Sequence, residues 1–183
     1  MNIPSTPFIA GEYIVKHVEN RWEQRGCLDL RRAVFCAEQQ VFDGDDRDAI
    51  DEQAISIAAI ACVAGIAEDV VGTVRIHRVD DTGLWQGSRL AVHPHYRGAA
   101  WLGTQLIVHA VSTAHALGCT RFLATVQVQN LRLFEKLAWR QLRALSVQGR
   151  PHVLMEADLS AALYAPRLET ELRFYGSARK AAA

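Results

Sequence analysis

Residues 88–106 hold a strand, a basic turn and the start of a helix, in that order. The apolar residues 90–92 predict the strand, and Arg97 and Gly98 lie in the turn. Gly103 and the apolar residues after it predict the helix. Anions bind where the free N–H groups of a helix N-terminus meet the positive end of its dipole. This order therefore predicts a cradle for the pyrophosphate of a nucleotide-like cofactor.

Spacing separates this turn from two other phosphate-binding loops. No Gly-Lys-Ser/Thr sequence follows the glycines, so the turn is not a P-loop. The Gly-x-Gly-x-x-Gly spacing of dinucleotide-binding folds is absent as well. An ordinary strand, turn and helix without a ligand is the alternative interpretation.

Composition indicates one globular domain. The 183 residues carry a formal net charge of zero, and half of them are hydrophobic. Balanced charge argues against nucleic-acid binding, which needs a basic surface. No signal-like segment or apolar run of about 20 residues is present, and the four cysteines lack zinc-finger spacing. We expect a cytoplasmic protein with free thiols, and neither a membrane nor a nucleic acid as a partner.

Hydrophobic periodicity predicts the elements that position the turn. Strands are expected over 13–18, 55–67, 70–79, 90–92, 121–129, 139–147 and 153–159, and helices over 22–41, 98–117 and 130–137. This order implies an α+β fold with one mixed sheet and helices on both faces. From residue 162 onward the pattern assigns no element.

Three segments resemble the GNAT superfamily of N-acetyltransferases. Residues 97–104 resemble its coenzyme-A loop, although the loop is one residue longer and Ala100 stands where a glycine is usual. Residues 122–130 resemble the fifth strand of that fold, and 133–139 resemble the helix that follows it. The resemblance implies a single GNAT-like domain over 1–183, with splayed central strands. Its parts would be an acceptor side (1–54), a coenzyme-A-binding core (55–160) and a C-terminal extension (161–183).

The whole chain also resembles a narrower branch, the bacterial N-acetyltransferases associated with nitrogen starvation and found in nitrilase-type gene clusters. The segments that carry this resemblance are 32–39, 45–48, 72–75, 85–90, 126–130 and 151–155. The N-terminal part is similar to acyl-homoserine-lactone synthases as well.

The resemblance implies an acyl-CoA-dependent N-acyltransferase. Acetyl-CoA would donate the acetyl group to an amine of a small molecule, by direct attack in a ternary complex and without a metal. A homodimer is possible, with the C-terminal extension against a partner subunit. The implied cofactor-binding residues are Leu90, Ala91, Val92, Arg97, Gly98, Ala99, Ala100, Trp101, Leu102, Gly103, Thr104, Asn130 and Phe134.

A base would assist this reaction, because an alkyl amine with a pKa of about 10 is mostly protonated at neutral pH. The carboxylate that many family members place before the cofactor loop is absent, and Phe134 stands where the usual Tyr would protonate the thiolate. His152 opens a strand expected to border the cleft and is the first candidate base. Glu38, on the first helix, is the second catalytic candidate. A turn histidine and a solvated glutamate are the alternative interpretations.

Two strand arginines and one tryptophan are candidates for substrate binding. Arg75 and Arg89 lie within apolar runs and could hold a substrate carboxylate, or pair with carboxylates of the protein instead. Trp85 could cover the acyl chain, or pack in the core. Glu38, together with Asp45, Asp46 and Asp48 of the acidic loop, could attract a cationic amine, or the loop could simply be solvated.

Two other functions remain open at this point. The missing carboxylate and Phe134 would suit a non-catalytic acyl-CoA-binding module. The N-terminal part would suit an acyl-homoserine-lactone-synthase-like acyltransferase.

Overall fold

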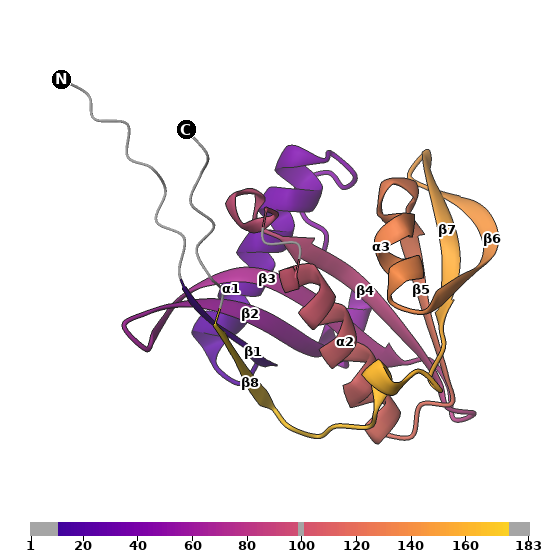
Figure 1. Cartoon of the computed structure of the whole chain (residues 1–183). Coiled ribbons are helices and arrows are strands. Elements are labelled where there is room, and N and C mark those ends of the chain that lie inside the picture. Colours follow the sequence, from indigo (N-terminus) through magenta and orange to yellow (C-terminus); the bar gives the residue numbers. More distant parts are fainter. Residues whose placement is uncertain (1–10, 99–100, 176–183) are drawn as a thin grey trace.

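One mixed sheet organises the part of the chain that the computed structural model describes, residues 11–98 and 101–175. Within these residues eight strands lie in the order β6-β7-β5-β4-β3-β2-β1-β8 (Figure 1). Only β4 and β5 pair in parallel; the other neighbours are antiparallel. The strands are β1 Glu12–His17, β2 Ile55–Val63, β3 Ile66–Arg78, β4 Leu84–Val92, β5 Arg121–Gln127, β6 Trp139–Val147, β7 Arg150–Ala157 and β8 Glu171–Tyr175.

Helices cover both faces of the sheet, as predicted. The α-helices among the described residues are α1 Arg21–Arg31, α2 Trp101–Ala116 and α3 Leu131–Lys136. A π-helical segment, η1 Arg32–Glu38, continues α1. Short 3-10 turns are η2 Ala49–Glu52, η3 Pro94–Tyr96, η4 Val128–Asn130 and η5 Ala162–Tyr164. The α+β arrangement predicted from the sequence is therefore confirmed.

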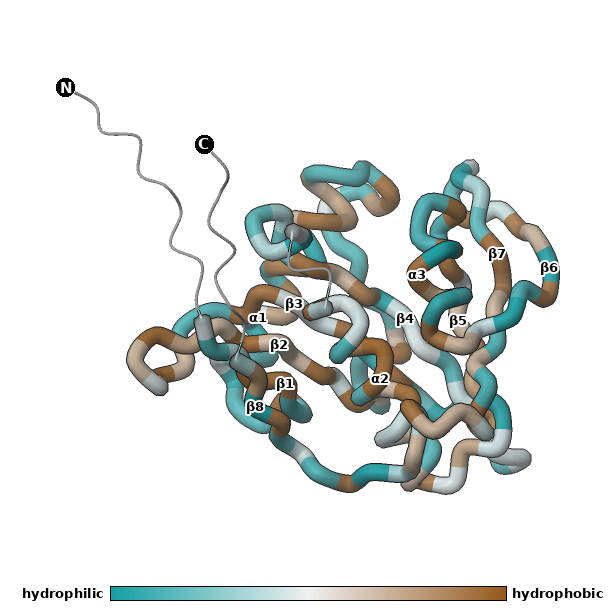
Figure 2. The backbone as a smooth tube through the Cα atoms, viewed as in Figure 1, coloured by the Kyte–Doolittle hydropathy of each residue, from teal (hydrophilic) through white to brown (hydrophobic). Residues whose placement is uncertain are grey.

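The larger core lies between the sheet and α2, on what we call the α2 face. Leu102, Leu106 and Val111 of α2 are fully buried there against apolar residues of β3, such as Val74. Figure 2 shows hydrophobic stretches, coloured brown, along the central strands and α2. A Cβ on Gly72 would lie 2.8 Å from Leu106 Cδ1, so a glycine at this position lets α2 pack closely on the sheet.

The opposite side, the α1 face, carries α1 and η1. Cys27 of α1 packs with Ile14 and Ile60 in one small apolar cluster. Val34 and Phe35 of η1 pack with further apolar residues in a second one. Because the two faces have separate cores, residues that alternate along one strand reach different helices.

Several element boundaries differ from those predicted. The helix expected over 22–41 is regular only to Arg31, and the π-helical η1 ends before Gln40, which has a φ of +52°. The turn between β2 and β3 lies at Ala64 and Gly65, both with positive φ, and not at residues 68–69. The final hairpin likewise turns at residues 148–149, so β7 begins at Arg150. Two-residue turns of this kind match the twist of the strands they join.

Strands β4 and β5 diverge at the centre of the sheet, as the predicted splay requires (Figure 1). Their parallel pairing covers only 84–87 of β4 and 121–124 of β5. Beyond that point β4 remains paired with β3, and β5 with β7. The register of β4 against β3 shifts near Arg89, whose φ is +56°. A bulge therefore bends β4 away from β5.

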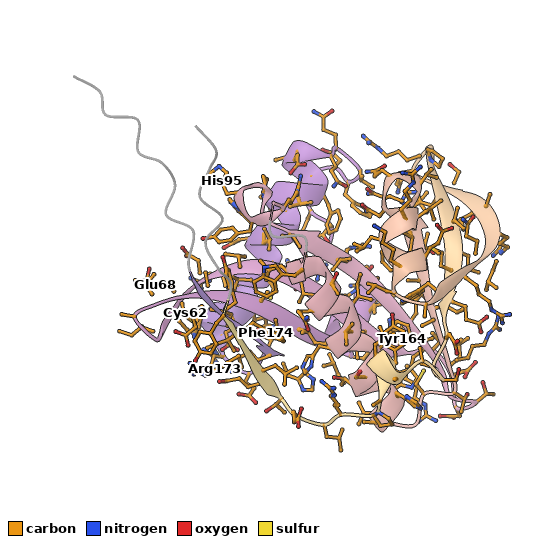
Figure 3. The ribbon with its side chains drawn as sticks, viewed as in Figure 1. Cys62, Glu68, His95, Tyr164, Arg173 and Phe174 are labelled. Atoms are coloured by element: carbon orange, nitrogen blue, oxygen red, sulfur yellow. The ribbon has the colours of Figure 1, made fainter. Side chains whose placement is uncertain are left out.

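The C-terminal extension returns to the same sheet. Buried Tyr164 of η5 lies beside the C-terminal end of α2 (Figure 3) and accepts a 2.7 Å hydrogen bond from the Trp139 indole N–H. Residues 171–175 then form β8, which pairs with β1. Among the described helices, none has the length and apolar composition needed to cross a bilayer. The four thiols are free, with Cys36 half-buried and the other three buried.

A buried histidine predicts a stability change with pH. His109 of α2 is 2% exposed, lies 5.1 Å from the His17 ring between centroids, and has no hydrogen-bond partner among the described residues. Burial, with smaller contributions from His17 and Arg167, lowers its pKa to about 4. An unfolded histidine takes up a proton near pH 6.5, whereas the folded one resists protonation down to about pH 4.

The free energy of unfolding should therefore fall by up to about 3 kcal/mol between pH 6.5 and pH 4 because of His109. His109→Leu should remove this part of the fall, as measured by urea unfolding across that range. The same change at exposed His95 is the control and should leave the pH dependence as in the wild type. An unchanged slope in His109→Leu would contradict the assignment.

Candidate functional site

A cavity of about 250 Å³ lies where β4 and β5 diverge. Its wall combines residues of these two strands with residues of η1, α2, α3 and β7. The cavity therefore reaches both faces of the sheet through the opening between the strands. The predicted site residues that line it are Arg89, Leu90, Asn130, Phe134 and His152.

The backbone of β4 borders this opening. On one side this segment pairs with β3 at Ser88, Ala91 and Val92, on either side of the bulge. On the other side, residues 88–92 face β5 without pairing to it. Leu90 and Val92 pack toward the α2 face, and Ala91 packs against the η1 cluster on the other face. Unpaired N–H and C=O groups at such an edge can bind an extended, amide-containing ligand.

The predicted phosphate cradle consists of η3 and the first turn of α2, where Trp101, Leu102, Gly103 and Thr104 lie. Leu102 is fully buried and Trp101 packs edge-on against Tyr13, so both side chains anchor the helix start. Ala99 and Ala100 lie outside the described residues. A Cβ added at Gly98 would meet no atom within 4 Å, so packing within the protein does not require glycine there.

Arg97 and Glu38 pair with each other. Arg97 Nη1 and Nη2 donate to the two carboxylate oxygens of Glu38 at 2.6 and 2.7 Å, and Arg97 Nε donates to the Val92 carbonyl at 3.0 Å. The hydrogen bonds from Arg97 hold the pKa of Glu38 below its ordinary value. The structure thus joins a residue predicted to bind phosphate to a residue predicted to be catalytic, and neither lines the cavity.

His152 lies on β7, opposite Gln127 of β5 in the sheet register, and its ring lines the cavity. The side chain is buried, and Nδ1 lies 2.9 Å from the Arg150 carbonyl oxygen. A carbonyl oxygen only accepts hydrogen bonds, so Nδ1 carries the hydrogen and Nε2 keeps its lone pair. Nε2 is therefore the nitrogen that can accept a proton in the cavity.

Arg75 is the most buried arginine of the site region, with 2% of its surface exposed. Its Nη1 and Nη2 donate to the two carboxylate oxygens of Asp48 at 2.7 and 2.8 Å, and Nη1 lies 2.8 Å from Asp51. Its Nε donates to Ser88 Oγ at 2.9 Å. All three guanidinium nitrogens are thus engaged within the protein. Arg75 ties the acidic loop to β4, immediately beside the bulge.

Arg31 and Arg89 complete this network by sharing Asp46. The Nε atoms of both arginines lie 2.8 Å from Asp46 Oδ2, and Arg31 Nη1 donates to Asp51 at 2.6 Å. Three arginines and three aspartates therefore neutralise one another. These contacts largely neutralise the negative charge that was predicted to attract a cationic amine.

Arg89 is the member of the network that lines the cavity. Its Nη2 donates to the Asp46 carbonyl at 2.7 Å and lies 3.1 Å from Asp48, and its guanidinium lies 4.4 Å from the centre of the Phe42 ring. Within the described part of the chain, its Nη1 has no hydrogen-bond partner. Arg89 is therefore held in place with one nitrogen available to a ligand.

Sequence reasoning missed the glutamines at the cavity. Gln127 Nε2 donates to Gln39 Oε1 at 2.9 Å, and Arg150 donates to the Gln39 carbonyl. These contacts connect Gln39, the residue after η1, with β5 and β7 across the cavity wall. No spacing pattern signals a pair of residues 88 positions apart. Predicted Trp85, in contrast, is 6% exposed and packs in the core of the α2 face, not in the cavity wall.

Across 11–98 and 101–175, no group of three or more His, Cys, Asp or Glu residues has a geometry that could hold a metal ion.

The central part of this chain is similar to a known protein family. The model of the acetyltransferase (GNAT) family matches residues 27–139. No curated protein matches the chain.

Solved structures share the fold at low sequence identity. A candidate N-acetyltransferase from Lactobacillus plantarum is 22% identical, with a TM-score of 0.68 over 79% of this chain and 97% of that one. An acyl-CoA N-acyltransferase from Pseudomonas aeruginosa is 20% identical, with a TM-score of 0.64 over 80% of this chain and 99% of that one. ElaA from Escherichia coli is 22% identical, with a TM-score of 0.60 over 80% of this chain and 98% of that one.

Removal of Arg75 should destabilise the protein strongly, because this buried guanidinium joins Asp48 and Asp51 to Ser88 of β4, and without it Asp48 keeps only Arg89 and Asp51 only Arg31. We expect Arg75→Met to lower the free energy of unfolding by about 3 kcal/mol or more in a denaturant titration. The matched control is Arg173→Met on β8 (Figure 3), which breaks a pair with Glu12 of β1 at the protein surface and should cost less than about 1 kcal/mol. Equal losses in the two variants would show that the network does not anchor the sheet.

Proposed function

Because the chain belongs to the acetyltransferase (GNAT) family, we propose that it is an acyl-CoA-dependent N-acyltransferase. Acetyl-CoA is the simplest donor, and the acceptor is an amine of a small molecule that attacks the thioester directly in a ternary complex. The observation that carries the proposal is the cavity between the open edges of β4 and β5, with His152 in its wall.

The donor side of the site lies along β4 and the start of α2. The open backbone edge at 88–92 supplies hydrogen bonds for the amides of the pantetheine arm, while Asn130 and Phe134 border the same space. The first turn of α2 supplies N–H groups for the pyrophosphate. Space around Gly98 supports a close approach of phosphate to the backbone.

Arg97 contributes to phosphate binding once the anionic ligand competes with Glu38 for its guanidinium. Both side chains are about 40% exposed, so this exchange costs little desolvation. Glu38 then acts as a positioning residue for Arg97. Its lowered pKa makes it a weak base.

The acceptor amine enters from the α1 face, where His152 and Arg89 line the cavity. The amine nitrogen bonds to the thioester carbonyl carbon, and Nε2 of His152 takes a proton from that nitrogen. The C–S bond then breaks, and the thiolate takes a proton from water or from His152. The free Nη1 of Arg89 suits an acceptor that carries a carboxylate or carbonyl oxygen.

The finer assignments rest on the sequence. The segments shared with the nitrogen-starvation-associated branch support assigning the chain to that branch. A cytoplasmic location is part of the same proposal. A non-catalytic acyl-CoA-binding module is the second candidate function, favoured by Phe134 and by the lack of a carboxylate among the described residues of the cavity wall. It would bind acyl-CoA without turnover across an amine panel. Adding S-adenosylmethionine to that panel tests the acyl-homoserine-lactone-synthase alternative.

Coenzyme-A binding is the first test. Acetyl-CoA at about 100 times its dissociation constant should stabilise the fold by about 2.7 kcal/mol and raise the melting midpoint by roughly 5–11 °C. Arg97→Ala should weaken binding at least tenfold and so reduce this rise by about half at the same concentration. Arg47→Ala, which removes an exposed arginine paired with Asp45, is the control. No rise in the wild-type protein with any thioester would reject the function, and unchanged affinity in Arg97→Ala would remove Arg97 from the site.

Turnover distinguishes the two catalytic candidates. His152→Gln should lower kcat by on the order of a hundredfold with little change in the KM for acetyl-CoA, since it removes the proton acceptor but not the donor site. Glu38→Gln should retain most of the wild-type kcat because Glu38 is held away from the cavity. Both kcat and the KM for acetyl-CoA are obtained by measuring the release of free coenzyme A with an acceptor amine identified in the panel. The opposite ranking of the two variants would make Glu38 the base.

A further inference from the structure

The α2 side of the cavity has an apolar wall. Helix α2 contributes Ile107, Ala110 and Val111, and β5 contributes Phe122 and Ala124. All five belong to the buried core of that face. This wall therefore offers no side chain that can donate or accept a hydrogen bond.

Aromatic rings close the same side. Phe134 and Trp139 both line the cavity and meet edge-on, with ring centroids 5.0 Å apart, and Trp139 meets Phe122 edge-on at 5.8 Å. The indole N–H donates to the Tyr164 hydroxyl, so the polar atom of Trp139 is already bonded within the protein. The end of the cavity is thus a fixed apolar surface.

Most polar residues of the cavity gather on the other side. The α1 face holds Gln39 (the residue after η1), Arg89 of β4, Gln127 of β5 and His152 of β7, and Gln39 and Gln127 share a hydrogen bond. The cavity is therefore divided into a polar part that suits the acceptor and an apolar part that has no role in holding it.

Small residues keep the apolar part open. Ala110 and Ala124 add only a methyl group each to the cavity wall. Gly87 has a different effect: a Cβ there would lie 3.0 and 3.1 Å from two atoms of the Phe122 ring, so glycine lets this ring pack against β4. Larger side chains at the two alanine positions would fill the space, as they do elsewhere in a close-packed core.

The pantetheine arm does not account for this part of the cavity. Its amides need hydrogen-bond partners when they leave water, because an unpaired buried amide is costly. The open backbone of β4 provides such partners, whereas the apolar wall provides none. An acetyl group extends only one methyl beyond the thioester. A hydrocarbon chain is the occupant that an apolar space favours.

We propose that the apolar part of the cavity binds the acyl chain of a medium-length donor, from butanoyl-CoA to octanoyl-CoA. This inference rests on the proposed function. The thioester lies beside the open edge of β4, the chain extends between α2 and β5 toward Phe134 and Trp139, and the acceptor approaches from the polar side. Ala110 and Ala124 then determine donor specificity.

Chain-length dependence tests this directly. Dissociation constants of the wild-type protein are measured by calorimetry for coenzyme A and for its acetyl, butanoyl, hexanoyl and octanoyl thioesters. Each added methylene should tighten binding about fourfold until the space is filled, and the heat-capacity change of binding should become more negative in step. Equal or weaker binding of the longer thioesters relative to acetyl-CoA would overturn the inference and leave the proposed function intact. Binding of no ligand in the series would overturn both.

A variant locates the chain. Ala110→Leu fills the apolar part from α2 and should abolish the gain from hexanoyl and octanoyl chains while acetyl-CoA binds within about twofold of wild type. Ala116→Leu makes the same change on the half-buried part of α2 outside the cavity wall and should behave as the wild type. A gain that persists in Ala110→Leu would place the chain elsewhere and overturn the inference. Should Ala110→Leu not fold, Ala124→Val on β5 gives the same readout.

Discussion

Backbone hydrogen bonding at the centre of the sheet decides what this molecule can do. Strands β4 and β5 are neighbours, yet they pair only over 84–87 and 121–124. Each strand keeps its partner on the far side, so the sheet remains intact while two edges face each other across a gap. An open edge inside a sheet is costly unless something binds to it. The cavity, the helix start at its border and the residues around it all take their places from that divergence.

The ionic network on the α1 face stabilises the divergence. Arg75 joins the acidic loop to Ser88, and Arg89, whose positive φ forms the bulge, joins the same loop through Asp46. A non-glycine residue with positive φ is held by its surroundings. The network therefore fixes the shape of β4 and the position of η1 together. Its charges cancel, and Arg89 is the one arginine among the described residues of the cavity wall.

Local patterns in the sequence predicted the elements that local chemistry controls. The strand before residue 93, the helix after Gly98 and the role of Phe134 as a residue without a proton to donate could all be read from types and spacing. The partners of charged residues could not, because Arg97 meets Glu38 across 59 positions and Arg89 meets Asp46 across 43. The π-helical form of η1 could not be predicted either, since its apolar residues fit an ordinary α-helix equally well.

Pairing of β8 with β1 brings together parts of the chain that are far apart in sequence. The Arg173–Glu12 contact between these strands spans 161 positions. During synthesis β1 can pair with β2 as soon as residue 63 has emerged, but its other edge stays bare until nearly the whole domain has been made. An unpaired edge of that kind can recruit strands from other chains. Pairing with β8 thus covers this edge of β1 and leaves the five-residue β8 as the outer strand, and so short an edge offers little for another chain to pair with.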